Sequence, residues 1–244
     1  MKSTKFAQVA GIMLALTFIL SCSGDDDGNG GGGGVGGSCD SDKGNNIANY
    51  KTKKIGSQTW MVENLNYNVE GSKCYGEGSE HVVVGVNCDK FQITYGVLSN
   101  AEIQANGVKY GRLYDYETAK TVCPSGWHLP SSDEFTTLVN FVGGEDIAGT
   151  KLMTTSGWKP FCSGNKPANG TDYYGFSALP GGSGRGGNFE FADVGNRGYW
   201  WSDTELDASW ACQLVIGDDG GISVCNSGMG SLKSALLSVR CVKD

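Results

Sequence analysis

The chain has 244 residues, of which 39 are glycine, and 19 Lys and Arg against 26 Asp and Glu give a formal net charge of −7. This acidic balance argues against nucleic acid and anionic lipid as partners, because both are recognised by clustered Lys and Arg. Beyond the N-terminal segment, no apolar stretch approaches the length that crosses a bilayer.

The N-terminal segment has the pattern of a cleaved export signal. Two lysines precede an apolar run from Val9 to Leu20, which is about half the length of a membrane span. The run ends in Leu20-Ser21-Cys22, which resembles the bacterial lipobox. The resemblance implies removal of residues 1–21 and acylation of Cys22 by a diacylglycerol and a further chain such as palmitate. The alternative is an ordinary signal peptide with an incidental cysteine.

Residues 22–38 form a predicted tether. Nine of the sixteen residues from Ser23 to Ser38 are glycine, so the segment cannot bury apolar area and is expected to be a flexible coil. Ser23 after the cysteine resembles lipoproteins sorted to the outer membrane. The acidic triplet Asp25–Asp27 resembles the export signal of surface-exposed lipoproteins in Bacteroidetes-like bacteria, although it could simply solubilise the tether. We therefore expect a lipid-anchored protein on the cell surface.

Residues 39–244 have the length of a single domain. An even number of cysteines in an exported chain predicts disulfides, and eight cysteines allow 105 pairings. A metal site is not predicted, because the chain has no CxxC motif and only two histidines, and no cofactor is predicted either. The eight cysteines are Cys39, Cys74, Cys88, Cys123, Cys162, Cys212, Cys225 and Cys241.

The first half of the domain contains two predicted strands and two predicted helices. The strands flank a Gly56–Ser57 turn within Tyr50–Tyr67. One helix is expected near Tyr114–Val122, because Pro124 disfavours its continuation. The second helix starts at Ser131, which forms a capping box with Glu134. Its apolar stripe is Phe135, Leu138, Val139 and Val142, and Gly143–Gly144 ends it.

The second half is expected to be loop from Gly164 to Gly198, where Gly, Asn, Ser and Pro dominate, and strands thereafter. This pattern predicts an α+β domain with two short helices, small antiparallel sheets and long loops rich in glycine and aromatic residues. The predicted strands are Tyr199–Ser202, Trp210–Ile216, Ile222–Cys225 and Ala235–Val242.

An ordered series of motifs between Tyr50 and Asp244 resembles the Fibrobacter succinogenes major paralogous domain. The motifs are long, so the resemblance is specific for the family, but it implies no particular reaction. The motifs lie at Ile55–Tyr67, Tyr110–Tyr114, Cys123–Pro130, Gly175–Gly182, Trp200–Ser202 and Ser238–Cys241.

A more distant resemblance to C-type-lectin-like domains rests on Ala119-x3-Cys123 with Gly126, Leu129, Glu134 and Leu138, and on the closing segment Val239–Val242. It implies the disulfides Cys123–Cys241 and Cys212–Cys225. Cys74–Cys88 is expected as a local disulfide, and elimination then leaves Cys39–Cys162.

The candidate ligand site is a set of aromatic and polar residues in the long loop region, which carries the ligand in lectin-like domains. Aromatic rings pack against pyranose faces, while Asn, Asp and Arg satisfy hydroxyls. The alternative is that these aromatic side chains are core, as we expect for Trp60, Trp127, Trp200 and Trp201. The predicted ligand-binding residues are Trp158, Tyr173, Tyr174, Arg185, Asn188 and Trp210, with Phe189, Asn196, Arg197 and Asp203 nearby.

Calcium-dependent sugar binding and catalysis are both disfavoured. In place of the lectin calcium triplet the chain has Lys166-Pro167-Ala168, which lacks carboxylate and amide ligands. No nucleophile, acid–base pair or free thiol stands out, and His128 is expected to be structural. We therefore expect a non-catalytic binding or adhesion module, with glycan or plant-fibre polysaccharide as ligand. The alternatives are an envelope protein that binds other surface proteins and, third, an enzyme.

Overall fold

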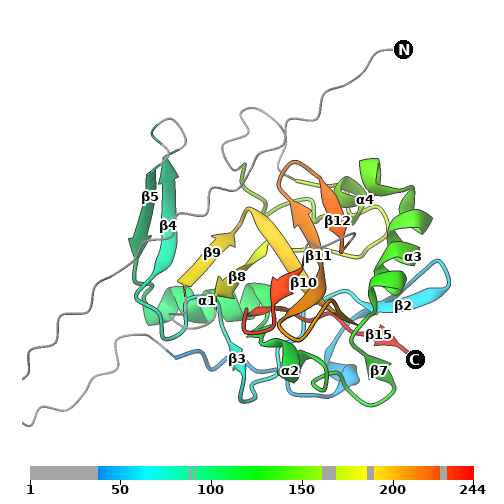
Figure 1. Cartoon of the computed structure of the whole chain (residues 1–244), viewed down its shortest axis with the longest axis horizontal. Coiled ribbons are helices and arrows are strands. Elements are labelled where there is room, and N and C mark those ends of the chain that lie inside the picture. Colours follow the sequence, from blue (N-terminus) through cyan, green and yellow to red (C-terminus); the bar gives the residue numbers. More distant parts are fainter. Residues whose placement is uncertain (1–37, 88–89, 91, 161–168, 186–189, 226–229) are drawn as a thin grey trace, which may run out of the picture. The chain divides into compact units, whose positions relative to one another are not determined.

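The computed structural model describes residues 38–87, 90, 92–160, 169–185, 190–225 and 230–244. The predicted signal, Cys22 and nearly all of the predicted tether lie outside these residues. The described residues belong to one unit, Gly34–Asp244, whose arrangement is drawn in Figure 1.

The described residues contain four α-helices, although the sequence pattern predicts two. The predicted helices are α2 (Tyr116–Ala119) and α3 (Ser132–Val142). The helices α1 (Asn100–Tyr110) and α4 (Glu145–Leu152) escape prediction because each has glycine among its few buried positions, which weakens the apolar stripe. A 3₁₀ turn, η1, spans Ile47–Asn49. None of the described helices is both long and apolar enough to cross a membrane.

Helix α3 begins and ends where the sequence predicts. The Ser131 hydroxyl accepts a hydrogen bond from the Glu134 backbone N–H, and the Glu134 carboxylate accepts one from the Ser131 N–H at 2.8 Å. The predicted apolar stripe is buried, and Gly143 ends the helix with φ of 120°. The helix therefore has one face fixed in the core and the opposite face in solvent.

Most strand pairs are antiparallel, as expected for an α+β fold. The expectation of small sheets is wrong, because one of the two sheets runs through eleven strands. One sheet has the order β1-β2-β15-β7, and the other has β3-β6-β14-β10-β8-β9-β4-β5 with β11 paired to β10, β12 and β13. The strands are β1 (Thr52–Ile55), β2 (Gln58–Met61), β3 (Ser72–Lys73), β4 (Val82–Asn87), β5 (Gln92–Gly96), β6 (Leu113–Tyr114), β7 (Trp127–His128), β8 (Gly181–Arg185), β9 (Glu190–Val194), β10 (Arg197–Glu205), β11 (Trp210–Gly217), β12 (Ile222–Val224), β13 (Ser231–Leu232), β14 (Leu237–Ser238) and β15 (Val242–Lys243).

The predicted loop between Gly164 and Gly198 is wrong in its second part. Strands β8 and β9 form an antiparallel pair there, and β8 also pairs with β10 through Gly182 and Gly198. A side chain at Gly182, which has φ of 68°, would lie 2.4 Å from the Ala192 carbonyl oxygen. The glycines that suggest a loop are thus required by close contact between neighbouring strands.

The core lies on both faces of β10. Trp200 and Trp201 are consecutive and both completely buried, and each joins a different apolar cluster. Trp200 packs in the cluster with the α3 stripe, while Trp201 packs in the cluster with Tyr114 and Tyr116. Because successive side chains of a strand point to opposite faces, β10 is covered on both sides. The expectation that Trp60, Trp200 and Trp201 are core is confirmed, and Trp127 is half-buried.

Three disulfides join described cysteines. Cys123–Cys241 and Cys212–Cys225 are the two pairs implied by the lectin resemblance. Cys74, however, is bonded to Cys39 and not to Cys88, so the expected Cys74–Cys88 and Cys39–Cys162 pairs are both wrong. Cys88 and Cys162 lie outside the described residues.

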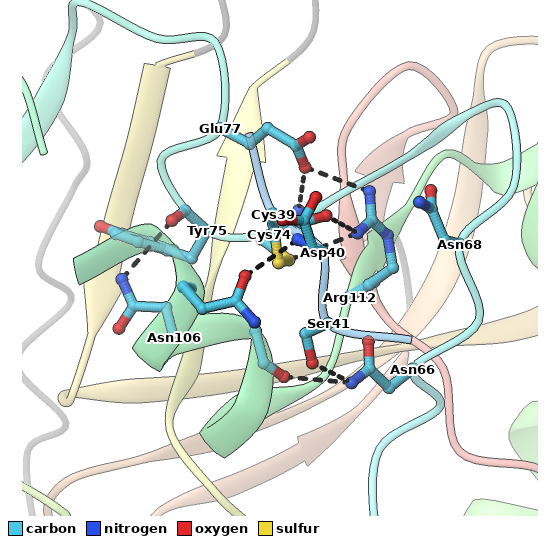
Figure 2. The surroundings of a disulfide bond; sticks show 12 residues. Cys39, Asp40, Ser41, Asn66, Asn68, Cys74, Tyr75, Glu77, Asn106 and Arg112 are labelled. Carbon is cyan, nitrogen blue, oxygen red and sulfur yellow. Dashed lines mark hydrogen bonds and ion pairs between the residues drawn. A yellow bond between two sulfur atoms is a disulfide. The ribbon is translucent and has the colours of Figure 1, made fainter. Parts of the chain in front are cut away.

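The Cys39–Cys74 bond lies against helix α1 (Figure 2). Gly107 faces it, and a Cβ there would lie 2.4 Å from the Cys39 sulfur and 2.5 Å from the Cys74 sulfur. The buried Arg112 guanidinium donates to the Cys39 carbonyl at 3.3 Å and forms an ion pair with Glu77 at 3.1 Å. Both cysteines are drawn together by this tertiary packing, which sequence spacing does not reveal.

Candidate ligand-binding platform

The strongest surface feature is a group of apolar and aromatic side chains at the outer edge of α3 and α4. Tyr173 is 74% exposed, Phe141 is 53% exposed and Ile147 is 42% exposed. Tyr174 and Lys151 are half-buried beside them. We call these five residues, Phe141, Ile147, Lys151, Tyr173 and Tyr174, the aromatic platform.

The aromatic rings of the platform touch edge to face. The centroids of Tyr173 and Tyr174 are 5.0 Å apart with an interplanar angle of 76°, and those of Phe141 and Tyr174 are 5.7 Å apart at 62°. This geometry is the favourable one for aromatic pairs. Lys151 Nζ lies 5.8 Å from the Tyr174 ring centroid and donates to the Val142 carbonyl at 3.0 Å. The Tyr174 ring is therefore held in place by Tyr173, Phe141 and the Lys151 side chain.

The loop that carries Tyr173 is bounded by two residues with unusual backbone geometry. Asp172 has φ of 46° and Ser177 has φ of 55°, in the left-handed region that non-glycine residues rarely adopt. Ser177 donates to both oxygens of the Asp172 carboxylate, from its N–H and from its hydroxyl, each at 2.7 Å. Strained residues of this kind cluster at functional sites, where the surrounding structure enforces them.

Backbone hydrogen bonds attach the same loop to the end of α4. Thr171 N–H donates to the Thr150 carbonyl at 2.8 Å, and Asp172 N–H donates to the Met153 carbonyl at 3.0 Å. Gly175 N–H closes the turn by donating to the Asp172 carbonyl at 3.0 Å. The platform loop is thus anchored at several points, which fixes the position of Tyr173.

The inner side of the loop is held by a buried arginine. Phe176 is fully buried, and its ring centroid lies 4.4 Å from the Arg240 guanidinium carbon. Arg240 donates to the carbonyls of Phe176 and Ser177 and to Asn64 Oδ1. Burial lowers the pKa of Arg240 to about 9, so the side chain is still charged at neutral pH. One guanidinium therefore joins the platform loop to the core.

A surface cavity of about 390 Å³ lies beside Tyr173. Its volume is within the range of small-molecule sites. Apolar contact comes from Ile147 and Tyr173, and hydrogen-bonding groups come from Asp146 and Lys151 together with Thr150 and Thr171. The arrangement can bind a ligand that has one apolar face and several hydroxyls along its edge.

The structure brings two of the predicted ligand-binding residues together, namely Tyr173 and Tyr174. Trp158 is a wrong prediction, because its side chain is only 4% exposed. The Trp158 indole N–H donates to Thr154 Oγ1 at 3.1 Å and to the Ala178 carbonyl at 3.2 Å. It is a core residue whose polar atom is satisfied internally.

The other predicted ligand-binding residues are not part of the platform. Trp210 is 40% exposed, but it begins β11 and is paired with Leu232 of β13. Arg185 is exposed at the end of β8, where it is paired with Glu190 of β9. Asn188 and its neighbour Phe189 lie outside the described residues.

Sequence reasoning missed Phe141 and Ile147. Phe141 is the one aromatic residue of α3 that lies off the buried stripe, and this displacement was a usable signal. Ile147 lies on α4, a helix that the sequence pattern does not predict. Apolar residues off the core stripe of a helix are therefore candidates for a surface site in the same way as loop aromatics.

His128 lies between two carboxylate side chains. Its Nδ1 is 2.7 Å from Asp244 Oδ1, and its Nε2 is 2.9 Å from Glu134 Oε1. The imidazole thereby joins β7, the start of α3 and the chain beyond β15. Within the described ranges, no group of three or more His, Cys, Asp and Glu residues is placed to hold a metal ion.

Comparison with known proteins identifies one family. The model of the Fibrobacter succinogenes major domain matches residues 54–243. No curated protein and no solved structure matches the chain. The segment before residue 54, including Cys39, precedes the matched region. Because the match covers most of the chain and the ordered motifs fall within it, this protein belongs to the Fibrobacter succinogenes major domain family.

Proposed function

We propose that the protein is a lipid-anchored lipoprotein of the outer membrane surface that binds polysaccharide through the aromatic platform. The observation that carries this proposal is Tyr173, a 74% exposed aromatic side chain on a loop fixed by the hydrogen bonds between Asp172 and Ser177. The proposal assigns no catalytic residue and no cofactor.

The chemistry of the platform suits a sugar ring. A pyranose has an apolar face of C–H groups, which packs on an aromatic ring, and an edge of hydroxyls that need hydrogen-bond partners. Tyr173 supplies an exposed ring, while the Asp146 carboxylate and the Lys151 ammonium line the adjacent cavity. Ligand sites commonly combine apolar walls with a few fixed polar groups in this way.

Rigidity of the platform loop favours affinity. A site that is already ordered loses little conformational freedom when its ligand binds. The loop is held by Asp172, by Arg240 and by backbone bonds to α4, so little reorganisation is needed.

Anchoring is proposed from the sequence, with Cys22 as the lipidated residue and the acyl chains as the membrane contact. The glycine-rich tether after it would span about 20–24 Å as a random coil. The Cys39–Cys74 disulfide supports this arrangement, because it attaches the first residues after the tether covalently to the domain. The domain would then be presented to insoluble polymers outside the cell.

A C-type-lectin-like fold is part of the proposal. It is supported by the Cys123–Cys241 bond, which joins the region after α2 to the closing strand, and by the local Cys212–Cys225 bond. An experimental structure that can be superposed on lectin-like domains over both disulfides tests it. A different strand order around Cys241 would exclude this fold.

Pull-down of the purified full-length chain by insoluble polysaccharides, together with a glycan array, tests the platform. We expect Tyr173→Ala to weaken binding roughly tenfold, about 1.4 kcal/mol, because loss of some 50–60 Å² of apolar contact has this effect at about 25 cal/mol/Å². Tyr173→Phe keeps the ring and should bind like the wild type. Trp210→Ala removes an accessible aromatic ring elsewhere and serves as the control.

A second function is favoured by the hairpin of β4 and β5. Val84, Ile93 and Tyr95 are each about half exposed there, and β5 is the last strand in the order of its sheet. An apolar edge strand is a template for pairing with another protein. Crosslinking on intact cells tests this alternative: Ile93→Lys should remove a crosslinked surface partner, whereas Tyr173→Ala should not. Retention of the partner by Ile93→Lys would exclude the hairpin.

A further inference from the structure

A second cavity, of about 250 Å³, is lined by residues between positions 43 and 66, by the end of α1 and by residues just before β8. None of the five platform residues lines it, although Ser177, which is hydrogen-bonded to Asp172 of the platform loop, is part of its lining. Its lining includes three lysines from separate parts of the chain, namely Lys43, Lys51 and Lys109. Among the described residues of its lining, Glu63 is the single carboxylate. We call this cavity the lysine pocket.

The charge of Glu63 is already compensated. Its Oε1 forms an ion pair with Lys43 Nζ at 3.1 Å, and its Oε2 accepts a hydrogen bond from the Lys51 backbone N–H at 3.1 Å. Partial burial opposes ionisation, but these bonds and the nearby lysine charges outweigh it and lower the pKa of Glu63. Glu63 is therefore ionised at neutral pH and neutralises Lys43.

Lysines outnumber carboxylates in the lining by two, although the Lys51 charge also acts on Glu63. Lys51 and Lys109 are both exposed, and Lys109 Nζ lies 4.7 Å from the Tyr110 ring centroid. The lining thus has a net positive charge in a chain whose formal net charge is −7. A local excess of cations attracts anionic ligands to the pocket.

Two buried asparagines, Asn64 and Asn66, line the pocket, and Asn66 Oδ1 is without a hydrogen-bond partner among the described residues. Asn64 is buried, and its Oδ1 accepts from the Trp200 indole and from Arg240, both at 2.8 Å. Its amide group donates to the Tyr110 carbonyl at 2.8 Å. The neighbouring walls include Val62 and Leu179, which are apolar. A ligand therefore meets both apolar side chains and lysine ammonium groups in this lining.

We infer that the lysine pocket binds a single acidic sugar residue of the uronic acid class. Its carboxylate would lie between the Lys51 and Lys109 ammonium groups, and the C–H face of its ring would pack on Val62 and Leu179. The volume of about 250 Å³ is smaller than that of sites for drug-sized ligands, which matches a monosaccharide. A small anion without a ring would contact the lysines alone and would leave Val62 and Leu179 without a partner. The ring of a sugar acid adds this apolar contact and therefore adds affinity.

Isothermal titration of the full-length chain with D-glucuronate and D-galacturonate tests this inference. We expect binding of at least one uronate to be at least tenfold tighter than that of D-glucose or acetate. The double variant Lys51→Gln, Lys109→Gln should weaken uronate binding at least tenfold. The matched control is Lys54→Gln, Lys243→Gln, which removes two exposed lysines outside the pocket and should change binding less than twofold.

Four outcomes overturn the inference. They are absence of uronate binding, equal loss of binding in the control variant, acetate binding as tight as uronate, and loss of uronate binding in Tyr173→Ala. The last result would place the sugar acid on the aromatic platform. Conversely, failure of the platform to bind neutral polysaccharide leaves the lysine pocket unaffected, so the two proposals can fail separately.

Discussion

Ser177 and Asp172 are hydrogen-bonded to each other across the turn that carries Tyr173, through two bonds of 2.7 Å to the two oxygens of one carboxylate. Both residues have a left-handed backbone, with φ of 55° and 46°. The two bonds offset the cost of this conformation, which is of order 1–3 kcal/mol per residue. The platform loop thus has a defined shape that its isolated sequence would not favour.

Asp172→Ala removes both of these bonds and leaves the Ser177 N–H unpaired. We expect the free energy of unfolding to fall by about 1–3 kcal/mol, and polysaccharide binding to weaken although Tyr173 is still present. Asp172→Asn tolerates the left-handed backbone and keeps one acceptor, so its effect should be smaller. Urea denaturation and pull-down measure the two effects. Unchanged binding in Asp172→Ala would show that the shape of the loop is irrelevant to the ligand.

Arg240 joins the platform loop to the core through buried carbonyls. Arg240→Met fills similar space, but it leaves the carbonyls of Phe176 and Ser177 without this donor, while Asn64 Oδ1 keeps its bond from the Trp200 indole. We expect a loss of about 3–5 kcal/mol of unfolding free energy, because an unpaired buried polar group costs about 1–3 kcal/mol. Urea denaturation measures it. Arg185→Met, at an exposed position, is the control and should change stability by less than about 0.5 kcal/mol; equal losses would contradict the assignment.

Gly107→Ala should destabilise the protein, although the same change in an exposed helix stabilises by about 1 kcal/mol. The new Cβ would lie 2.4–2.5 Å from both sulfurs of the Cys39–Cys74 disulfide, so the helix or the disulfide must shift. Thermal unfolding checks the sign of the effect.

A double-mutant cycle isolates the cause of that effect. Replacement of Cys39 and Cys74 by serine costs about 4 kcal/mol in the chain-entropy model for their separation of 35 residues. Gly107→Ala should then cost less in the serine background, because the contact with a fixed disulfide is lost. An identical cost in both backgrounds would mean that the strain arises elsewhere. Peptide mapping without reduction checks the Cys39–Cys74 pair directly.

The hydrogen bonds of His128 predict that the free energy of unfolding depends on pH. Partial burial opposes its protonation, but hydrogen bonds to Asp244 and Glu134 outweigh this and raise its pKa above 6.5. A raised folded-state pKa contributes stability that is complete below the unfolded value and is lost as pH rises through the folded value. Unfolding free energy should therefore decline from about pH 6.5 upward. The decline should be absent in His128→Gln and retained in His81→Gln, which alters an exposed histidine without these bonds.

Several elements could be read from the sequence because their signals are local. The capping box of Ser131 and Glu134 fixes the start of α3, and the Gly56–Ser57 turn fixes the hairpin of β1 and β2. These features depend on residues within a few positions of each other. The family could be read for a similar reason, since its motifs are contiguous, and the match to residues 54–243 confirms it.

Other features depend on neighbours far away in the chain. Helix α1 has Gly107 where a large apolar residue would have revealed it, because two sulfurs occupy that space. Strand β8 has Gly182 because a neighbouring strand approaches closely there. The sequence predicts an exposed Trp158, but its indole N–H donates to the carbonyl of Ala178, twenty positions further along the chain. Exposure is a property of the packed molecule, and local composition does not encode it.

By itself the sequence determined the family, the α+β class and the caps of α3, since each depends on adjacent residues, whereas the lipid anchor and the tether stay predictions. Only the tertiary structure decided which cysteine pairs with Cys74, which aromatic side chains face solvent and which lysines converge on one pocket. Those relationships join residues that lie far apart in sequence, and they exist only once the chain has packed around Trp200 and Trp201.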